Sequence, residues 1–175
     1  MNLAYSHLIP DNFPDNSRVW IYQSNRLFTI GEALELEEML NGFLARWNAH
    51  GTAVRGYGNL LFGQFLVLMA DETETQVSGC STDSSVQLVK AIEQRFQVNM
   101  FDRQYLGFVI KGRTEMLPLS QLSYALENGF ITGDTLYFNN LVQTKSELLT
   151  RWMIPVKDSW LKNKLPRLQE RQDAM

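Results

Sequence analysis

The chain has 175 residues, of which 45% are hydrophobic and 20% charged, and this mixture is typical of one globular domain of ordinary size. The formal net charge of −3 disfavours a general nucleic-acid-binding protein, because such a protein needs a basic surface. No apolar run approaches the roughly 20 residues of a membrane-spanning helix, and the first ten residues do not resemble a secretory signal. A single cysteine excludes an internal disulfide, and we therefore expect a cytoplasmic protein. From the net charge and the lack of a long apolar run, we expect that it binds neither nucleic acids nor membranes.

The first half of the chain carries the strongest helix signal. After an irregular lead-in over residues 1–16, the segment Arg18–Tyr22 is rich in β-branched and aromatic residues and predicts a strand. Thr29 and Glu32 then have the spacing of a capping box. Apolar residues follow at helical spacing as far as Trp47, so a helix is predicted that ends near His50, with Gly51 as its stop.

Two strands are predicted next, over Thr52–Tyr57 and Gln64–Ala70, as an antiparallel pair. In the second of them both alternating sets of side chains are apolar. We therefore expect this strand to lie in the centre of a sheet and to be covered on both faces.

The second half continues with alternating helix and strand signals. Ser84–Gln97 is a predicted helix with a capping box at Ser84, and the turn at Lys111 and Gly112 is predicted to join two strands. The other predicted elements are strands over 105–110, 113–117 and 135–138, a helix from Pro118 to Gly129, a helix opened by a capping box at Thr144, and a partly ordered tail over 155–175.

This order predicts an α+β fold in a single domain over residues 17–154. The first six elements match the βαββαβ plan of ferredoxin-like folds, in which two helices cover one face of an antiparallel sheet. The apolar residues on the other face must also be covered, either by the third predicted helix or by a second subunit. We therefore expect a homodimer.

The segment "SGCSTDSS" (78–85) holds the only cysteine and is the first candidate catalytic site. Cys80 is predicted between a central strand and a helix start, where the helix dipole would increase its thiolate fraction. His50 is the only candidate base, with Asp71 or Asp83 to orient it, but we expect His50 at the opposite end of the sheet. The simpler interpretation is that Cys80 is a small, half-buried residue in a turn.

Other polar residues suggest a binding site for a small anion. The hydroxyl groups of Ser81, Thr82, Ser84 and Ser85 could hold phosphate at the helix start, although capping is by far the better explanation of these residues. Arg18 and Arg26 flank the aromatic strand and could help to stack a ligand, and Lys145 could bind an anion.

Acidic residues form a second, metal-binding candidate. Carboxylates near the segment, at Asp71, Glu72, Glu74 and Asp83, could bind magnesium but have no diagnostic spacing. Zinc is not indicated, because the two histidines are far apart and there is no cysteine pair. No cofactor is predicted.

The strings "SRVWIYQSNR", "WNAHG", "SGCSTDSS", "FDR", "FNNLVQTKSEL" and "DSW" resemble a family of short uncharacterised bacterial proteins. The resemblance covers residues 17–160, and it supports a cytosolic bacterial setting. Members are sometimes labelled ABC transporter ATPases, but the sequence has no GxxxxGK[ST] phosphate-binding loop. The resemblance implies no catalytic residues.

The function predicted from the sequence is a non-catalytic binding or regulatory module. The alternative is a small hydrolase, dependent on a thiolate or on a carboxylate-bound metal, with its site around Cys80, Asp71 and Asp83.

Overall fold

The protein has a mixed α+β fold, as predicted. The computed structural model describes residues 3–74, 76 and 79–165, without the side chains of residues 80 and 81. The chain forms two compact units: unit 1 comprises residues 1–103 and 139–152, and unit 2 comprises residues 104–138 and 153–175. The boundaries at 103, 138 and 152 all fall within the range predicted as one domain. Each unit is described by itself below.

The chain contains helices and strands together with short 3₁₀ turns at Ser6–Leu8, Leu119–Gln121, Val156–Asp158 and Trp160–Lys164. The elements are β1 (Arg18–Gln23), α1 (Ile30–Leu44), β2 (Asn48–Ala49), β3 (Thr52–Ala53), β4 (Arg55–Leu61), β5 (Phe65–Asp71), α2 (Gly79–Phe96), β6 (Tyr105–Ile110), β7 (Arg113–Pro118), α3 (Leu122–Glu127), β8 (Leu136–Phe138), α4 (Lys145–Arg151) and β9 (Met153–Pro155).

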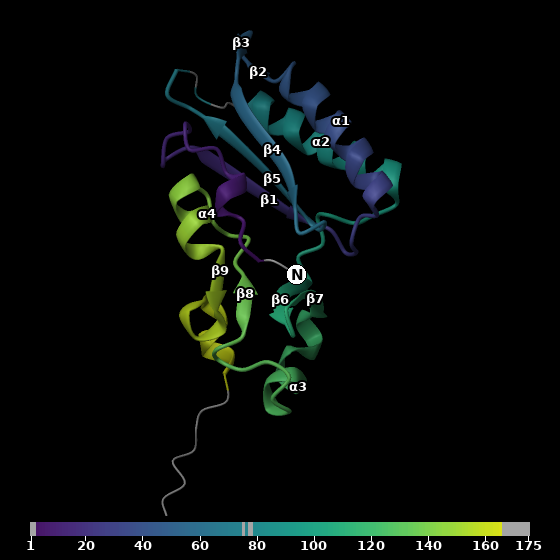
Figure 1. Ribbon diagram of the computed structural model, residues 1–175, viewed down its shortest axis with the longest axis vertical. Helices are drawn as coiled ribbons and strands as arrows, with labels where there is room; N and C mark the ends of the chain where they lie inside the picture. The colour runs from purple at the N-terminus through teal and green to yellow at the C-terminus, as the bar shows by residue number, and fades with distance from the viewer. Residues whose placement is uncertain (1–2, 75, 77–78, 166–175) are drawn as a thin grey trace, which may run out of the picture. The chain divides into compact units, whose positions relative to one another are not determined.

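Unit 1 is built on a three-stranded antiparallel sheet with the order β1-β5-β4. Six of the seven residues of β5 are buried, so the prediction of a central strand covered on both faces is confirmed. Helices α1 and α2 lie on the same face of this sheet (Figure 1). They bury Leu66 and Leu68 of β5 against apolar residues of both helices, which include Leu36, Leu40, Val89 and Ile92.

The second face of this sheet is covered by α4 and by the N-terminal lead-in. The ring of Trp152, which directly follows α4, packs edge-on against Phe65 of β5 at 5.4 Å and against Tyr5 at 4.9 Å. The Tyr5 hydroxyl donates to the carbonyl of Leu148, and burial raises the pKa of Tyr5 to about 12, so it stays a donor. The expectation that the third helix or a second subunit covers this face is therefore wrong.

The helix α1 begins as predicted but ends earlier. The Thr29 hydroxyl accepts from the Glu32 amide and the Glu32 carboxylate accepts from the Thr29 amide, which confirms the capping box. The helix stops at Leu44, and β2 and β3 follow as a hairpin. Its two turn residues, His50 and Gly51, have φ values of 51° and 82°, because a two-residue hairpin needs left-handed backbone.

The helix α2 begins at Gly79, five residues before the predicted cap. Ser84 therefore lies inside the helix, and the prediction of a capping box there is wrong. The buried Ser85 hydroxyl donates to the carbonyl of Thr82, 2.7 Å away. Serine favours caps but can also bond to the preceding turn, and this ambiguity explains the error.

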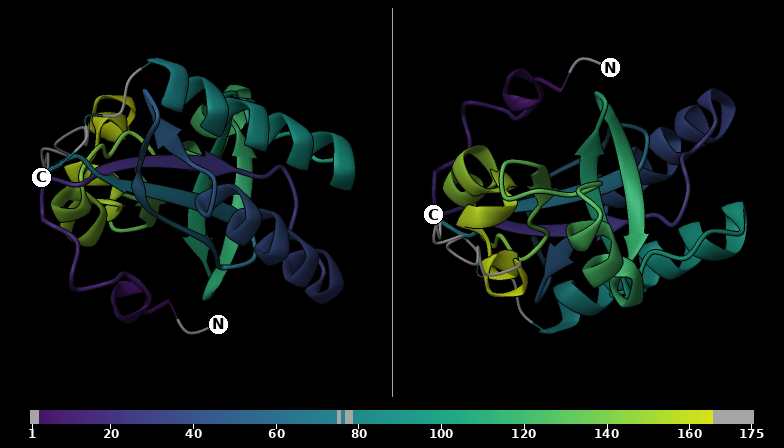
Figure 2. Two further views of the ribbon diagram at one scale, coloured as in Figure 1. Left: turned by 90° about the horizontal axis from the view of Figure 1, so that it is seen from above. Right: turned by 90° about the horizontal axis from the view of Figure 1, so that it is seen from below.

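Unit 2 contains a four-stranded antiparallel sheet with the order β7-β6-β8-β9. The hairpin of β6 and β7, visible as two long green arrows in the right-hand view of Figure 2, turns at Lys111 and Gly112 as predicted. The segment predicted as a tail contributes to the core, because Val156 and Leu161 are fully buried there.

The ferredoxin-like core is not confirmed. In that plan the fourth strand joins the same sheet as the first three. Here the corresponding strand, β6, pairs with β7 and β8 in the sheet of unit 2.

A close approach between α1 and β4 gives a test of the unit 1 packing. A Cβ atom on Gly56 would lie 2.6 Å from Cε3 of Trp47 and 3.0 Å from Cδ2 of Leu44. We expect Gly56→Ala to lower the free energy of unfolding by about 1–3 kcal/mol, because the indole must move. Urea denaturation measures this change. The control is Gly31→Ala in α1, where nothing lies within 4 Å; an equal loss in both variants would contradict the prediction.

Candidate functional site

Arg26, a predicted ligand-binding residue, connects the start of α1 to the end of α2. Its guanidinium donates to both carboxylate oxygens of Glu32 at 2.9 Å and to the carbonyl of Phe96. The Arg26 hydrogen bonds, followed by the Thr29 amide, hold the pKa of Glu32 at about 2. Arg26 is therefore engaged in structural contacts.

Asp71, a candidate catalytic carboxylate, ends β5 and is engaged on two sides. It accepts from the Thr73 hydroxyl and amide and from the Arg55 guanidinium, 3.0 Å away. These hydrogen bonds, with that of the Thr73 hydroxyl the largest, hold its pKa below the usual range. A carboxylate in this setting is a weak base, so Asp71 is poorly suited to proton abstraction.

Arg18 and Lys145 are far apart in the sequence, but a backbone bridge between Arg18 and Thr144 brings the start of β1 next to the start of α4. Arg18 stacks over the Trp20 ring at 5.0 Å and faces Glu72 at 3.8 Å. It also lines a cavity of about 350 Å³ with Gln143 and Thr144, but Thr144 serves there as the cap of α4.

Lys145 is buried and does not face an anion site. Its ammonium donates to the backbone carbonyls of Asp11 and Phe13, at 3.1 and 2.7 Å. Only 5% of the residue is exposed. The lysine thus anchors the N-terminal lead-in to α4, and its predicted role in anion binding has no support in these contacts.

The candidate residues of the segment 78–85, from Cys80 to Ser85, all belong to the start of α2. The side chains of Cys80 and Ser81 lie outside the described residues, and Asp83 is exposed. His50 is exposed at the tip of the β2–β3 turn. Thr82 is half-buried, and its carbonyl accepts the Ser85 hydroxyl.

The prediction that His50 and Cys80 belong to opposite ends of the sheet is wrong. Strands β4 and β5 run in opposite directions along the sheet, so the chain returns to the end of the sheet at which α1 finishes. Helix α2 therefore starts at that same end. Helix α2 accordingly contacts β2. The end of α1 and the first half of α2 therefore enclose a common space.

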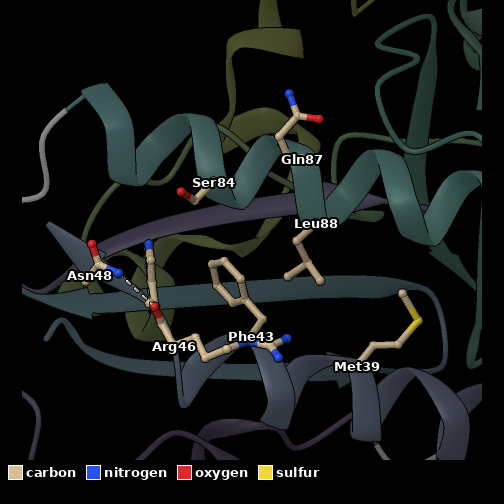
Figure 3. A pocket seen from close by; sticks show the side chains of 8 residues that line it. Met39, Phe43, Arg46, Asn48, Ser84, Gln87 and Leu88 are labelled. Atoms are coloured by element: carbon tan, nitrogen blue, oxygen red, sulfur yellow. Dashed lines mark hydrogen bonds between the residues drawn. The ribbon is translucent and has the colours of Figure 1, made fainter. Parts of the chain in front are cut away.

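That space is a groove with a volume of about 450 Å³ between α1 and α2. Its lining residues are Met39, Phe43, Arg46, Trp47, Asn48, Ser84, Gln87 and Leu88. Phe43 and Leu88 point toward one another across it, and Asn48 donates from its side-chain amide to the carbonyl of Arg46 (Figure 3). We call it the α1–α2 groove.

An aromatic cluster supports the α1–α2 groove. The Trp47 ring lies 5.0 Å from Phe43 and 5.9 Å from Trp20, and it packs over Gly56. Trp47 is almost fully buried, so this wall of the groove is rigid. Arg46 is exposed beside it and, among the described residues, forms no salt bridge.

Of the residues that line the α1–α2 groove, only Ser84 is a candidate site residue from the sequence. Trp47 is predicted only as the last apolar residue of a helix, and an exposed arginine beside it carries no distinct signal. The string "RWN" (46–48), shortly after the end of α1, places a cation next to an indole, a combination that suits an anionic aromatic ligand. Its meaning depends on α2, which is distant in sequence.

Within the described part of the chain, no helix has the length and hydrophobicity needed to cross a bilayer. The described His, Cys, Asp and Glu residues likewise form no group of three or more that could hold a metal ion. Comparison with known family models, with curated proteins and with solved structures finds no match to this chain.

The contacts of Lys145 predict a structural effect of its removal. Lys145→Met keeps most of the side-chain volume but leaves two carbonyl groups without their donor. We expect a loss of about 1–3 kcal/mol in the free energy of unfolding, because buried polar groups without partners are costly. Urea denaturation measures this loss, and Lys90→Met, at an exposed site of α2, is the control. Equal stability of the two variants would show that the anchor is unimportant.

The Arg26–Glu32 pair predicts a pH dependence. The folded-state pKa of Glu32 is about 2, below its ordinary value of 4.5, so the ionised carboxylate favours folding. This contribution is complete above pH 4.5 and is lost as the pH falls toward 2. We expect Glu32→Gln to flatten the change in urea midpoint over that range. Glu38→Gln, on the exposed face of α1, should retain the wild-type profile; a wild-type profile in Glu32→Gln would contradict the assignment.

Proposed function

We propose that this protein is a non-catalytic binding module and that the α1–α2 groove of unit 1 binds a small amphipathic anion. The observation that carries the proposal is the position of Arg46, an exposed cation next to a rigid aromatic wall. A planar apolar body would lie against Phe43 and Leu88, while a carboxylate or phosphate would pair with Arg46.

The charges elsewhere in unit 1 support this choice of site. Arg26 and Arg55 are each engaged with a carboxylate, and Lys145 is engaged with backbone carbonyls. Arg46 has no such contact among the described residues. A guanidinium is well suited to an anionic group, because it presents two donors in a plane.

The size of the groove limits the ligand. A volume of about 450 Å³ lies within the range of small-molecule sites, roughly 300–1,000 Å³. Besides Arg46, the polar lining residues of the groove are Asn48, Ser84 and Gln87, so a ligand with a polar end would find further hydrogen-bonding groups. Ser84 also belongs to the set of residues that the sequence suggested for a small anion.

Three further assignments from the sequence are kept as proposals. Apart from the inserted β2–β3 hairpin, the order β1-α1-β4-β5-α2, with the sheet order β1-β5-β4, is consistent with the first five elements of a ferredoxin-like plan. The resemblance to short bacterial proteins and a cytoplasmic location are supported by the quoted strings and by the single cysteine.

The alternative function, a small hydrolase around Cys80, Asp71 and Asp83, is less well supported. Asp71 is engaged with Arg55 and Thr73, and Asp83 is exposed. A thiol titration with a disulfide reagent distinguishes the two functions. Fast reaction of Cys80 at about pH 6 would favour the hydrolase, because only a thiolate of low pKa reacts there.

The proposed site predicts the effect of removing its cation. We expect naphthalene-2-carboxylate, used as a probe, to shift the NMR signals of the Trp47 indole and the Ser84 amide. Arg46→Gln should weaken this binding at least about tenfold, because a hydrogen bond between charged groups contributes about 1.5–3 kcal/mol.

Two controls define the outcome. Lys90→Gln removes a charge from the exposed face of α2 and should bind the probe as the wild type does. The neutral probe naphthalene-2-carboxamide should bind the wild type and Arg46→Gln equally. If the carboxylate leaves the Trp47 and Ser84 signals unchanged at millimolar concentration, the proposed site is wrong.

A further inference from the structure

Strand β4 is an open edge of the unit 1 sheet. It pairs with β5 along its whole length, Arg55–Leu61, and within the described residues no strand pairs with its other side. The opposite edge of the sheet differs, because the Val19 amide of β1 donates to the carbonyl of Gln143 and Arg18 bridges to Thr144.

The sequence of β4 does not protect this edge. Proteins usually guard an open strand with lysine, proline, a bulge or a short length. The seven residues of β4, RGYGNLL, contain neither lysine nor proline. The only charged residue, Arg55, lies at the first position, where it donates to Asp71 and to the carbonyl of Asn12. Gly56 and Gly58, in the middle of the strand, are half-buried and carry no side chain that could block a pairing strand.

A groove with both polar and aliphatic lining residues adjoins the same edge on the helix side. It has a volume of about 430 Å³ and runs between α1 and β4, with Gly58, Asn59 and Leu60 in its lining. Ile30 and Leu34 of α1 border it and are 84% and 60% exposed. Glu37 is its only charged lining residue. Exposed aliphatic residues beside an open strand are typical of an interaction surface.

We propose that β4 pairs antiparallel with β4 of a second copy of this chain, with Gly58 on the two-fold axis. The two three-stranded sheets would then form one continuous six-stranded sheet. This register uses all seven residues, and it places the helices of both copies on the same face, because the paired positions sum to an even number. An interface of this kind is isologous and closes at two copies.

The side chains of β4 are self-complementary in this register. Asn59 already donates to the Tyr57 hydroxyl in its own strand, at 3.1 Å, and pairing places Asn59 directly opposite the partner's Tyr57. Gly56 comes opposite the partner's Leu60, a small residue against a large one. Arg55 comes opposite the partner's Leu61, so no like charges meet within the paired strands. These matches favour a second copy over an unrelated strand.

The proposed interface does not depend on the ligand site. The α1–α2 groove and the groove beside β4 have no lining residue in common. Because α4 covers the second face of the unit 1 sheet, a second copy would add backbone hydrogen bonds at the β4 edge instead. Failure of one proposal therefore leaves the other intact.

Sedimentation equilibrium and hydrogen exchange of the full chain test the proposal together. We expect a concentration-dependent dimer between about 1 and about 100 µM, with β4 amides that exchange more slowly as the concentration rises. Asn59→Lys should weaken dimerisation at least about tenfold, because it places two ammonium groups on diagonal neighbours across the axis. Thr52→Lys, on exposed β3, carries the same charge change and should dimerise as the wild type does.

Three results would overturn the proposal. The first is a chain that stays monomeric at about 100 µM. The second is an Asn59→Lys variant that dimerises as strongly as Thr52→Lys. The third is a dimer whose β4 amides exchange at the same rate at every concentration, which would place the interface elsewhere.

Discussion

The burial of β5 on both faces is the constraint on which unit 1 depends. A strand with apolar side chains on both sides requires two separate covering layers. On one side α1 and α2 supply the layer, and on the other α4 and the N-terminal lead-in do. The chain therefore has to return to unit 1 at residue 139, after forming most of unit 2. The lead-in, although irregular, is held by Tyr5 and Lys145 and forms part of the core.

Several charged residues of unit 1 also hold its elements together. Arginine and lysine side chains form hydrogen bonds that connect its helices, strands and lead-in. Arg26 connects α1 to α2, Arg55 connects β4 to Asp71, and Lys145 connects α4 to the lead-in. Because these charges are engaged, Arg46 beside Trp47 is the cation in unit 1 best placed for a ligand.

Local signals in the sequence predicted local structure well. The capping box of Thr29 and Glu32, the turn at Lys111 and Gly112 and the apolar pattern of β5 are all confirmed. Each depends on a few adjacent residues and on backbone geometry. The predictions for Ser84 and for the end of α1 were wrong where two local structures competed. A serine suits either a cap or a helix turn, and His50-Gly51 suits either a helix stop or a hairpin.

The sequence by itself determined the α+β class, the centre of one sheet and the positions of its strongest turns, because these follow from backbone preferences and from alternation of apolar residues. Only the tertiary structure decided the partner of β6, the cover of the second sheet face and the position of the α1–α2 groove. These features depend on residues far apart in the chain, such as Phe65 and Trp152, whose rings are in contact, and Arg46 and Ser84, which line the same groove. No local pattern encodes such a contact, since many distant pairs of similar shape and polarity compete for it.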